Sequence, residues 1–95
     1  MHSIVELKKQ GNRVKVYHYR LFKNKRTNIL ILKQFFQGNR DEEMLHYGGQ
    51  TEIELFMPDG KIHKGVAECS LKDNFNRKIG IQTALGRIIK QMIKV

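Results

Sequence analysis

Apolar residues near the C-terminus recur with the spacing of an α-helix. One face carries them at i, i+4, i+7 and i+11, and two neighbours widen it: Ile81, Leu85, Ile88 and Met92, then Ala84 and Ile89. The opposite side is polar and cationic: Thr83, Arg87, Lys90 and Lys94. The pattern predicts that Cys69 to Val95 forms a strand end, a polar turn and one long helix. Its apolar face should pack on a core, and its cationic face should meet solvent or an anion. Gly80 and Gly86 weaken a helix interior, so we expect their small size to allow close approach by another backbone or by a ligand, with packing favoured.

Strict alternation of apolar and polar residues marks the middle of the chain. Thr51 to Met57 is the clearest half-buried strand, and Pro58-Asp59-Gly60 predicts a tight turn after it. Ile62 to Cys69 should return as the partner strand. Gly65 inside that strand indicates a bulge or a close contact. This region therefore predicts a β-hairpin.

The first half is rich in β-branched and aromatic residues. Ser3 to Lys9 and Arg13 to Lys23 are interpreted as a hairpin around Gln10-Gly11-Asn12. After a polar turn, Thr27 to Gln37 predicts a third strand whose two apolar faces are typical of a central strand or an oligomer interface. Asp41-Glu42-Glu43 should begin a short helical turn that ends at Gly48-Gly49.

These elements predict one α+β domain over residues 1 to 95. The expected architecture is an antiparallel sheet of about five strands, two hairpins plus a central strand, with one long C-terminal helix packed on it. A chain of this length has a modest core, so association into a homo-oligomer would help it.

Charge is distributed unevenly along a chain with a formal net charge of +9. Residues 1 to 40 contain ten Lys and Arg against the single acid Glu6, and residues 41 to 95 contain eight of each sign. Such an excess favours polyanions or phosphate ligands over a purely solubilising role. The cations alternate with Tyr17, Tyr19 and Phe22, which suits either a stacking platform for bases or, the favoured interpretation, strand residues that cover a helix. The candidate polyanion contacts are Arg13, Lys15, Arg20, Lys23, Lys25, Arg26 and Lys33.

No catalytic signature is present, so we do not expect an enzyme or a cofactor. The four histidines lack the spacing of a metal pair, and the acids at Asp41 to Glu43 are interpreted as solvated, so no metal site is predicted. The lone Cys69 excludes an internal disulfide and is expected to be buried as a small hydrophobe. The longest apolar run, Ile29 to Leu32, is too short to span a membrane, and the N-terminus does not resemble a secretory signal, so a cytoplasmic location is expected.

The turn before the C-terminal helix is the best candidate binding site. Ser70, Asp73 and Asn74 are credible N-cap residues, and a helix start presents free N–H groups and a positive dipole end to an anion. Cations, amides and an aromatic ring that suit a nucleotide surround it: Lys72, Asn74, Phe75, Asn76, Arg77 and Lys78. The alternative is a capped helix with Phe75 as a buried anchor, and this is favoured for Phe75.

The run Cys69 to Gly80, continued by Ala84-Leu85-Gly86-Arg87, resembles the C-terminal signature of small bacteriophage proteins, the Thoeris anti-defence proteins that act as nucleotide sponges. The resemblance covers about a quarter of the chain. It implies an α+β fold, a homo-oligomer and sequestration of a cyclic ADP-ribose isomer or related nucleotide without cleavage. It also implies ligand contacts at Asn74, Asn76 and Arg87, in the cytoplasm of the host cell.

Three functions therefore remain open. The first is a non-enzymatic phage protein that sequesters an anionic cyclic nucleotide. The second is a basic nucleic-acid-binding phage regulator that uses the first half of the chain. The third is a protein-binding inhibitor of an acidic host factor, with the apolar third strand as its interface.

Overall fold

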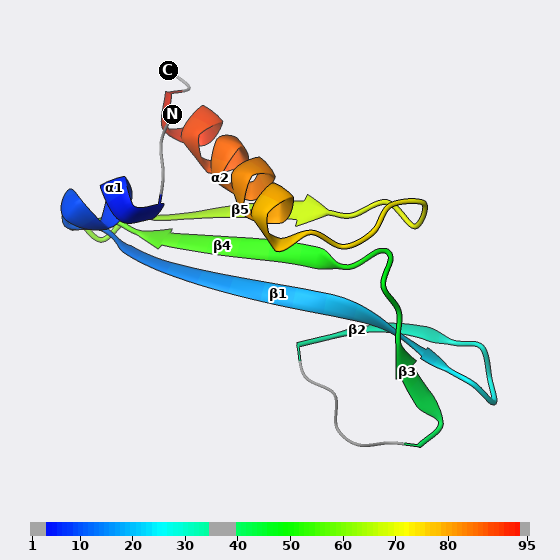
Figure 1. Cartoon of the computed structure of the whole chain (residues 1–95). Helices are drawn as coiled ribbons and strands as arrows, with labels where there is room; N and C mark the ends of the chain where they lie inside the picture. The colour runs from blue at the N-terminus through cyan, green and yellow to red at the C-terminus, as the bar shows by residue number, and fades with distance from the viewer. Residues whose placement is uncertain (1–3, 35–39, 94–95) are drawn as a thin grey trace.

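The computed structural model describes residues 4–34 and 40–93. Its elements follow one another as α1 (Ile4–Lys9), β1 (Arg13–Asn24), β2 (Leu30–Lys33), β3 (Glu42–Met44), β4 (Gln50–Phe56), β5 (Ile62–Glu68) and α2 (Arg77–Ile93). The strands form a five-stranded antiparallel sheet, and α2 lies across one face of it over β4 and β5 (Figure 1). The predicted α+β class, an antiparallel sheet with one long C-terminal helix, is confirmed.

The sheet is built around β1, whose 12 residues serve two groups of partners. Its first part, from Arg13 to Tyr19, pairs with β4, and β4 pairs in turn with β5. Its last residues pair with β2 on one side and with β3 on the other. We call the first group with its two helices the body, and the ribbon β2, β3 and residues 20–24 of β1 the arm.

The arm makes the molecule elongated. Its principal extents are 48 × 24 × 21 Å and its radius of gyration is 15.6 Å, whereas a compact chain of this length has a radius of gyration of about 12 Å. Figure 1 shows the arm leaving the body at the far end of β1, where neither of the described helices covers it.

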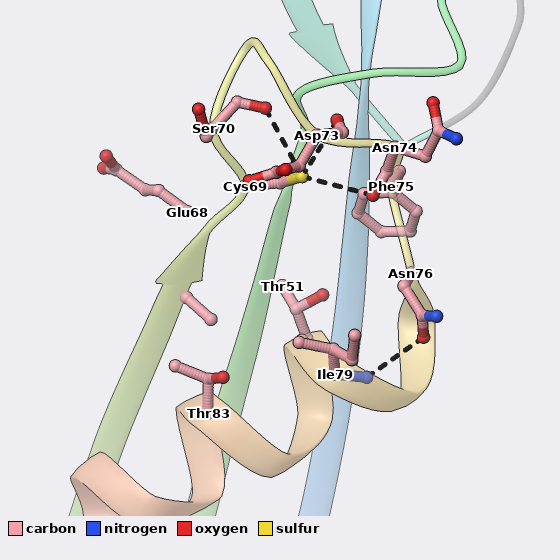
Figure 2. Close-up of a pocket in the computed structure, with 12 residues that line it drawn as sticks. Thr51, Glu68, Cys69, Ser70, Asp73, Asn74, Phe75, Asn76, Ile79 and Thr83 are labelled. Carbon is pink, nitrogen blue, oxygen red and sulfur yellow. Dashed lines mark hydrogen bonds between the residues drawn. The ribbon is translucent and has the colours of Figure 1, made fainter.

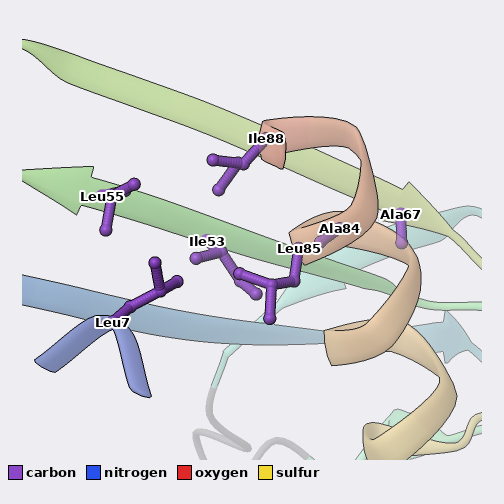
Figure 3. Close-up of a cluster of buried hydrophobic side chains, with 7 residues drawn as sticks. All are labelled: Leu7, Ile53, Leu55, Ala67, Ala84, Leu85 and Ile88. Atoms are coloured by element: carbon purple, nitrogen blue, oxygen red, sulfur yellow. The ribbon is translucent and has the colours of Figure 1, made fainter. Parts of the chain in front are cut away.

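The core lies in the body, between the sheet and the helices (Figure 3). β4 alternates as its sequence predicts, with Thr51, Ile53 and Leu55 almost completely buried. The predicted apolar face of α2 is buried at Ala84, Leu85 and Ile88, while Met92, near the end of the helix, is 40% exposed. The predicted cationic side is exposed at Arg87 and Lys90, and Lys94 lies outside the described residues.

Two glycines allow the close packing of α2 on the sheet. A Cβ on Gly65 of β5 would collide with the Ala84 carbonyl oxygen, and one on Gly80 would collide with Thr51. The predicted close contact is confirmed at Gly65. At Gly80 the close neighbour is the Thr51 side chain and not another backbone. At Gly86 a Cβ would meet nothing within 4 Å, so no other part of the described backbone approaches that residue.

The first predicted hairpin is wrong, because Ile4–Lys9 forms a helix where its first strand was expected; its second strand is present as β1. Only Leu7 of α1 is buried, packed on the core, and the helix closes through Gly11 at a φ of 92°. The Asn12 side-chain amide also donates to the Leu7 carbonyl at 2.9 Å. Ile4 and Leu7 are three residues apart, a spacing that suits one face of a helical turn. The predicted strand began at Ser3, which lies outside the described residues.

Two further predictions in the arm need correction. The third strand is only Leu30–Lys33 and lies at the edge of the sheet, so it is not central within this chain; residues 35–37 of the predicted strand lie outside the described residues. Asp41 to Glu43 do not begin a helix. Glu42 and Glu43 belong to β3, which occupies the edge of β1 left open beyond β4, and Glu42 forms an ion pair with Lys33 at 2.6 Å.

Among the described residues, no helix is long and apolar enough to cross a membrane.

Candidate functional site

The site begins where α2 begins. Asn76 is the N-cap, since its Oδ1 accepts a hydrogen bond from the Ile79 N–H at 3.1 Å and its carbonyl accepts one from Gly80 at 3.0 Å. The predicted caps Ser70, Asp73 and Asn74 are therefore wrong. Ser70 instead forms the preceding turn, where its carbonyl accepts a hydrogen bond from the Asp73 N–H at 3.1 Å.

The loop from Cys69 to Asn76 is fixed by its backbone to the segment that separates β3 from β4. Gly48 donates to the Asp73 carbonyl at 3.2 Å, Phe75 donates to the His46 carbonyl at 2.8 Å and Cys69 donates to the Gly49 carbonyl at 2.9 Å. These bonds satisfy backbone groups outside any regular strand, so the loop is held in one shape.

Phe75 anchors this loop against β1. Its ring packs directly over Gly49, where any Cβ would lie 2.5 Å from the ring. The Arg20 guanidinium lies 4.7 Å from the ring centroid, and His18 meets the ring edge-on at 5.8 Å. The structure thus agrees with Phe75 as an anchor, because its ring already has these partners.

A pocket of about 510 Å³ opens between this loop, the end of β5 and the first turns of α2 (Figure 2). This volume lies in the range of small-molecule sites. Seven of its twelve lining residues carry polar side chains, with two carboxylates, two amides and three hydroxyls. The lining residues are Thr51, Ala67, Glu68, Cys69, Ser70, Asp73, Asn74, Phe75, Asn76, Ile79, Gly80 and Thr83.

Three of the predicted ligand-binding residues, Asn74, Phe75 and Asn76, line the pocket. The predicted cations Lys72, Arg77 and Lys78 are exposed and lie close in sequence to lining residues, but they do not line the pocket themselves. Arg77 and Lys78 form the first turn of α2, where their charge adds to the positive end of the helix dipole.

Arg87 lies elsewhere. It is two turns further along α2 than Ile79 and Gly80, and its guanidinium donates to the Val66 carbonyl on β5. The structure thus gives this residue a partner in the protein, at the edge of the sheet.

The floor of the pocket contains a polar contact that sequence reasoning missed. The hydroxyl of the buried Thr51 lies 2.9 Å from Nδ1 of His18. Burial lowers the pKa of His18 below its ordinary value, and the nearby positive charge of Arg77 lowers it further. A neutral imidazole therefore lies under the helix start at neutral pH. The small residue Gly80 was the signal that something packs there.

Cys69 is half-buried, and its thiol is a hydrogen-bond donor at the pocket wall. Its Sγ lies 3.5 Å from the carbonyl oxygens of Asp73 and Asn74 and 3.6 Å from that of Ser70 (Figure 2). The prediction of a simple buried hydrophobe is wrong in this respect, since the thiol helps to hold the loop.

The candidate polyanion contacts do not form one patch. Arg13 and Lys25 are separated by the whole of β1, which at about 3.3 Å per residue is some 36 Å long. Arg20 is stacked on Phe75 and donates to the Leu45 carbonyl at 3.0 Å, and Arg26 lies 3.7 Å from Asp41. Lys23 pairs across the strands with Leu30 and Glu43 in the arm.

The tyrosines of β1 lie on the face of the sheet opposite α2, and carboxylates accompany them there. Tyr19 donates to Glu52 at 3.4 Å, and Glu52 also forms an ion pair with Lys64 at 3.0 Å. Partial burial raises the pKa of Tyr17 and of Tyr19, and the neighbouring carboxylates raise both further. A phosphate backbone on this face would meet negative charge in the central strand.

Among the described residues, no group of three His, Cys, Asp or Glu side chains is arranged to hold a metal ion. Comparison of the chain with family models, with curated proteins and with solved structures gives no match. The resemblance to nucleotide-sequestering phage proteins stays a prediction.

Proposed function

We propose that the protein binds an anionic nucleotide in the α2 pocket and sequesters it without cleaving it. The observation that supports this most is the composition of the pocket, which has amides and carboxylates in its wall and cations beside it at a helix N-terminus. Each group suits one part of a nucleotide.

The phosphates would lie at the start of α2. Two of the cations beside the pocket, Arg77 and Lys78, are exposed on the first turn of α2, and that turn presents backbone N–H groups to an anion. Lys72, exposed in the loop before the helix, adds a third cation.

The sugar and the base would lie against the loop and the end of β5. Glu68 and Asp73 are exposed carboxylates of the pocket wall, and carboxylates accept hydrogen bonds from ribose hydroxyls. The Asn74 side chain offers both a donor and an acceptor to the edge of a base, and Asn76 still offers its Nδ2 because only its Oδ1 is used by the helix cap.

Sequestration accords with a pocket formed by a loop that its backbone bonds hold in place, since a preorganised site binds with a smaller entropy cost. In this role the protein is a phage-type anti-defence protein that acts in the cytoplasm of the host cell and removes a cyclic nucleotide signal.

Isothermal titration calorimetry with cyclic ADP-ribose, ADP-ribose, 3′,5′-cyclic AMP and inorganic phosphate tests the proposal. We expect one nucleotide to bind stoichiometrically and to be recovered intact when the protein is denatured. Absence of any nucleotide binding below the millimolar range, or recovery of a cleaved product, contradicts it.

Matched variants locate the site. Arg77→Ala should weaken binding about tenfold, the loss expected for one charge-assisted contact. Lys90→Ala removes the same charge from an exposed position further along α2 and should leave affinity nearly unchanged. Equal losses in both variants would indicate only long-range attraction by net charge.

Arg87→Ala separates two roles for that residue. If the resemblance is right about ligand contact, affinity falls. If the bond to the Val66 carbonyl is its main role, affinity stays and stability falls by about 0.5–1.5 kcal/mol.

The nucleic-acid hypothesis predicts instead that affinity grows with oligonucleotide length and falls steeply with salt. The distribution of the basic residues over both faces and both ends of β1 gives it less support than the pocket gives to nucleotide binding.

A further inference from the structure

The two outer edges of the sheet are treated differently by the chain. The edge at β5 is covered by α2, because Arg87 donates to the Val66 carbonyl and Gln91 donates to the Lys64 carbonyl at 2.9 Å. Both side chains come from one face of the helix, four residues apart. Natural proteins protect edge strands in this way against unwanted pairing.

The edge at β2 has no such cover among the described residues, and it is apolar. Among the described strands β2 pairs only with β1, and Leu30, Ile31 and Leu32 are 44%, 45% and 46% exposed. Ile29 just before the strand is 60% exposed. A bare apolar edge is a template for another strand.

The backbone of β2 has groups directed outward for such pairing. Asn24 donates to the Ile29 carbonyl at 3.0 Å, and Phe22 is the register partner of Ile31, so Ile29 and Ile31 direct their backbone groups toward β1. Because successive residues of a strand alternate in direction, Leu30 and Leu32 direct their N–H and C=O groups to the outer edge.

We propose that β2 pairs antiparallel with β2 of a second copy of this chain, around a twofold axis at Ile31. In that register Leu30 lies opposite Leu32 of the second copy and Ile31 lies opposite itself. The two leucine pairs would exchange about four hydrogen bonds. In a twofold dimer the same surface of each copy forms the interface, as this register requires.

Charge also suits a second copy. Each chain carries a formal net charge of +9, which opposes self-association wherever cations face each other. In the proposed register Lys33 lies opposite the apolar Ile29, and Glu42 of its own chain neutralises it at 2.6 Å. The two copies would therefore meet without opposed lysines in the paired strands.

The pairing also accounts for the composition of β2. Apolar residues on both faces are typical of an internal strand, whereas β2 lies at an edge within one chain. A second copy would place it inside a continuous sheet. The interface is small, so we expect a dimer with a dissociation constant in the micromolar range.

Sedimentation equilibrium measures the molecular mass of the full chain and of variants that place a negative or a positive charge at residue 31, on the proposed twofold axis. The full chain should be dimeric at about 100 μM, well above the expected dissociation constant. Ile31→Glu alone and Ile31→Lys alone should each be monomeric, because like charges would meet on the axis. An equimolar mixture of the two variants should restore the dimer, since Glu would then face Lys.

Ile62→Glu is the matched control, because Ile62 is 59% exposed on β5 at the opposite edge and should leave the dimer intact. A monomeric wild-type chain overturns the proposal, as does a dimer that survives Ile31→Glu. Failure of the mixture to dimerise also overturns it, because the rescue depends on residue 31 facing itself. Loss of the dimer in Ile62→Glu assigns the interface to β5 and overturns it as well.

Discussion

The two ends of β1 show what a second layer does for a strand. In the body, Val14 and Val16 face a core that α2 and α1 close from above, and Ile53 and Leu55 beside them have no measurable exposure. In the arm, Phe22 is buried to a similar degree beside its cross-strand neighbours and Lys33, whose Nζ lies 5.9 Å from the ring centroid. Among the described residues, the body thus contains a core between a sheet and two helices, whereas the arm is a single layer of strands.

A single layer of three short strands contributes little stability of its own. We therefore expect the body to fold without help from the arm, and the arm to stay ordered only while β1 is held in the body. Hydrogen exchange can resolve these two units, since it reports local opening.

Loss of the core should have the largest effect. Ile88→Ala removes a fully buried side chain between α2 and the sheet, and we expect unfolding free energy to fall by about 2–5 kcal/mol. Denaturant titration measures this, and exchange should accelerate in the body and the arm together. Ile93→Ala, at a position 68% exposed on the same helix, should cost far less. An arm that kept its protection in Ile88→Ala would contradict its dependence on the body.

Truncation in the arm should have a more confined effect. Phe22→Ala should remove about 3 kcal/mol of local stability, so that amides of β2 and β3 exchange on the order of a hundredfold faster. The amides of β5 and α2 should keep their protection. If they lose it equally, the arm and the body form one cooperative unit and the comparison is wrong.

The contact between α2 and the sheet should give smaller effects, with one glycine substitution lowering the unfolding free energy and another raising it. Gly65→Ala places a Cβ against the Ala84 carbonyl and 2.8 Å from Cγ1 of Ile88, and a backbone atom there cannot move without the helix. We expect it to destabilise the body by about 1–3 kcal/mol. In Gly86→Ala, on α2, the added Cβ meets no neighbour, and the substitution should raise the unfolding free energy by about 0.5–1 kcal/mol. Thermal unfolding of both variants measures the difference, and equal signs would contradict the packing described here.

The body was predictable from sequence to a greater extent than the arm, for a physical reason. In β4 and α2 the local pattern and the tertiary environment agree, since the alternating residues and the helical stripe are buried as their spacing predicts. In the arm and in α1 the local pattern and the tertiary environment disagree. Glu42 and Glu43 suit a helix start by composition, but pairing with β1 makes them a strand, and that decision comes from residues far away in sequence.

The candidate site divides in the same way. The polar loop with Asn74, Phe75 and Asn76 could be located because its composition is local. Thr51 and Thr83 could not, because each belongs to an amphipathic element and only the packing of α2 on β4 brings them into one pocket. Arg87 fits the helical cationic stripe equally well as a ligand contact and as a cover for the β5 edge, so its bond to Val66 could not be foreseen.

The smallest expected effect is a pH dependence of stability that arises at the junction between the body and the arm. His18 lies where β1 leaves α2, and burial followed by the charge of Arg77 lowers the pKa of its imidazole in the folded state. The unfolded chain therefore binds the proton more tightly, so the stability associated with neutral His18 is fully present above the unfolded pKa of about 6.5. It is lost as the pH falls through the lowered folded pKa. Urea titrations at several pH values should show wild-type stability decreasing across this window.

His18→Asn keeps a polar side chain near Thr51 but cannot titrate, so its stability should vary less over the same pH range. His63→Asn on β5 leaves His18 in place and should keep the wild-type dependence. A pH profile unchanged in His18→Asn would show that protonation of this residue does not act on folding. If the profile changes and the amides of the arm open first at low pH, the junction between α2 and β1 is where the stability of the arm is set.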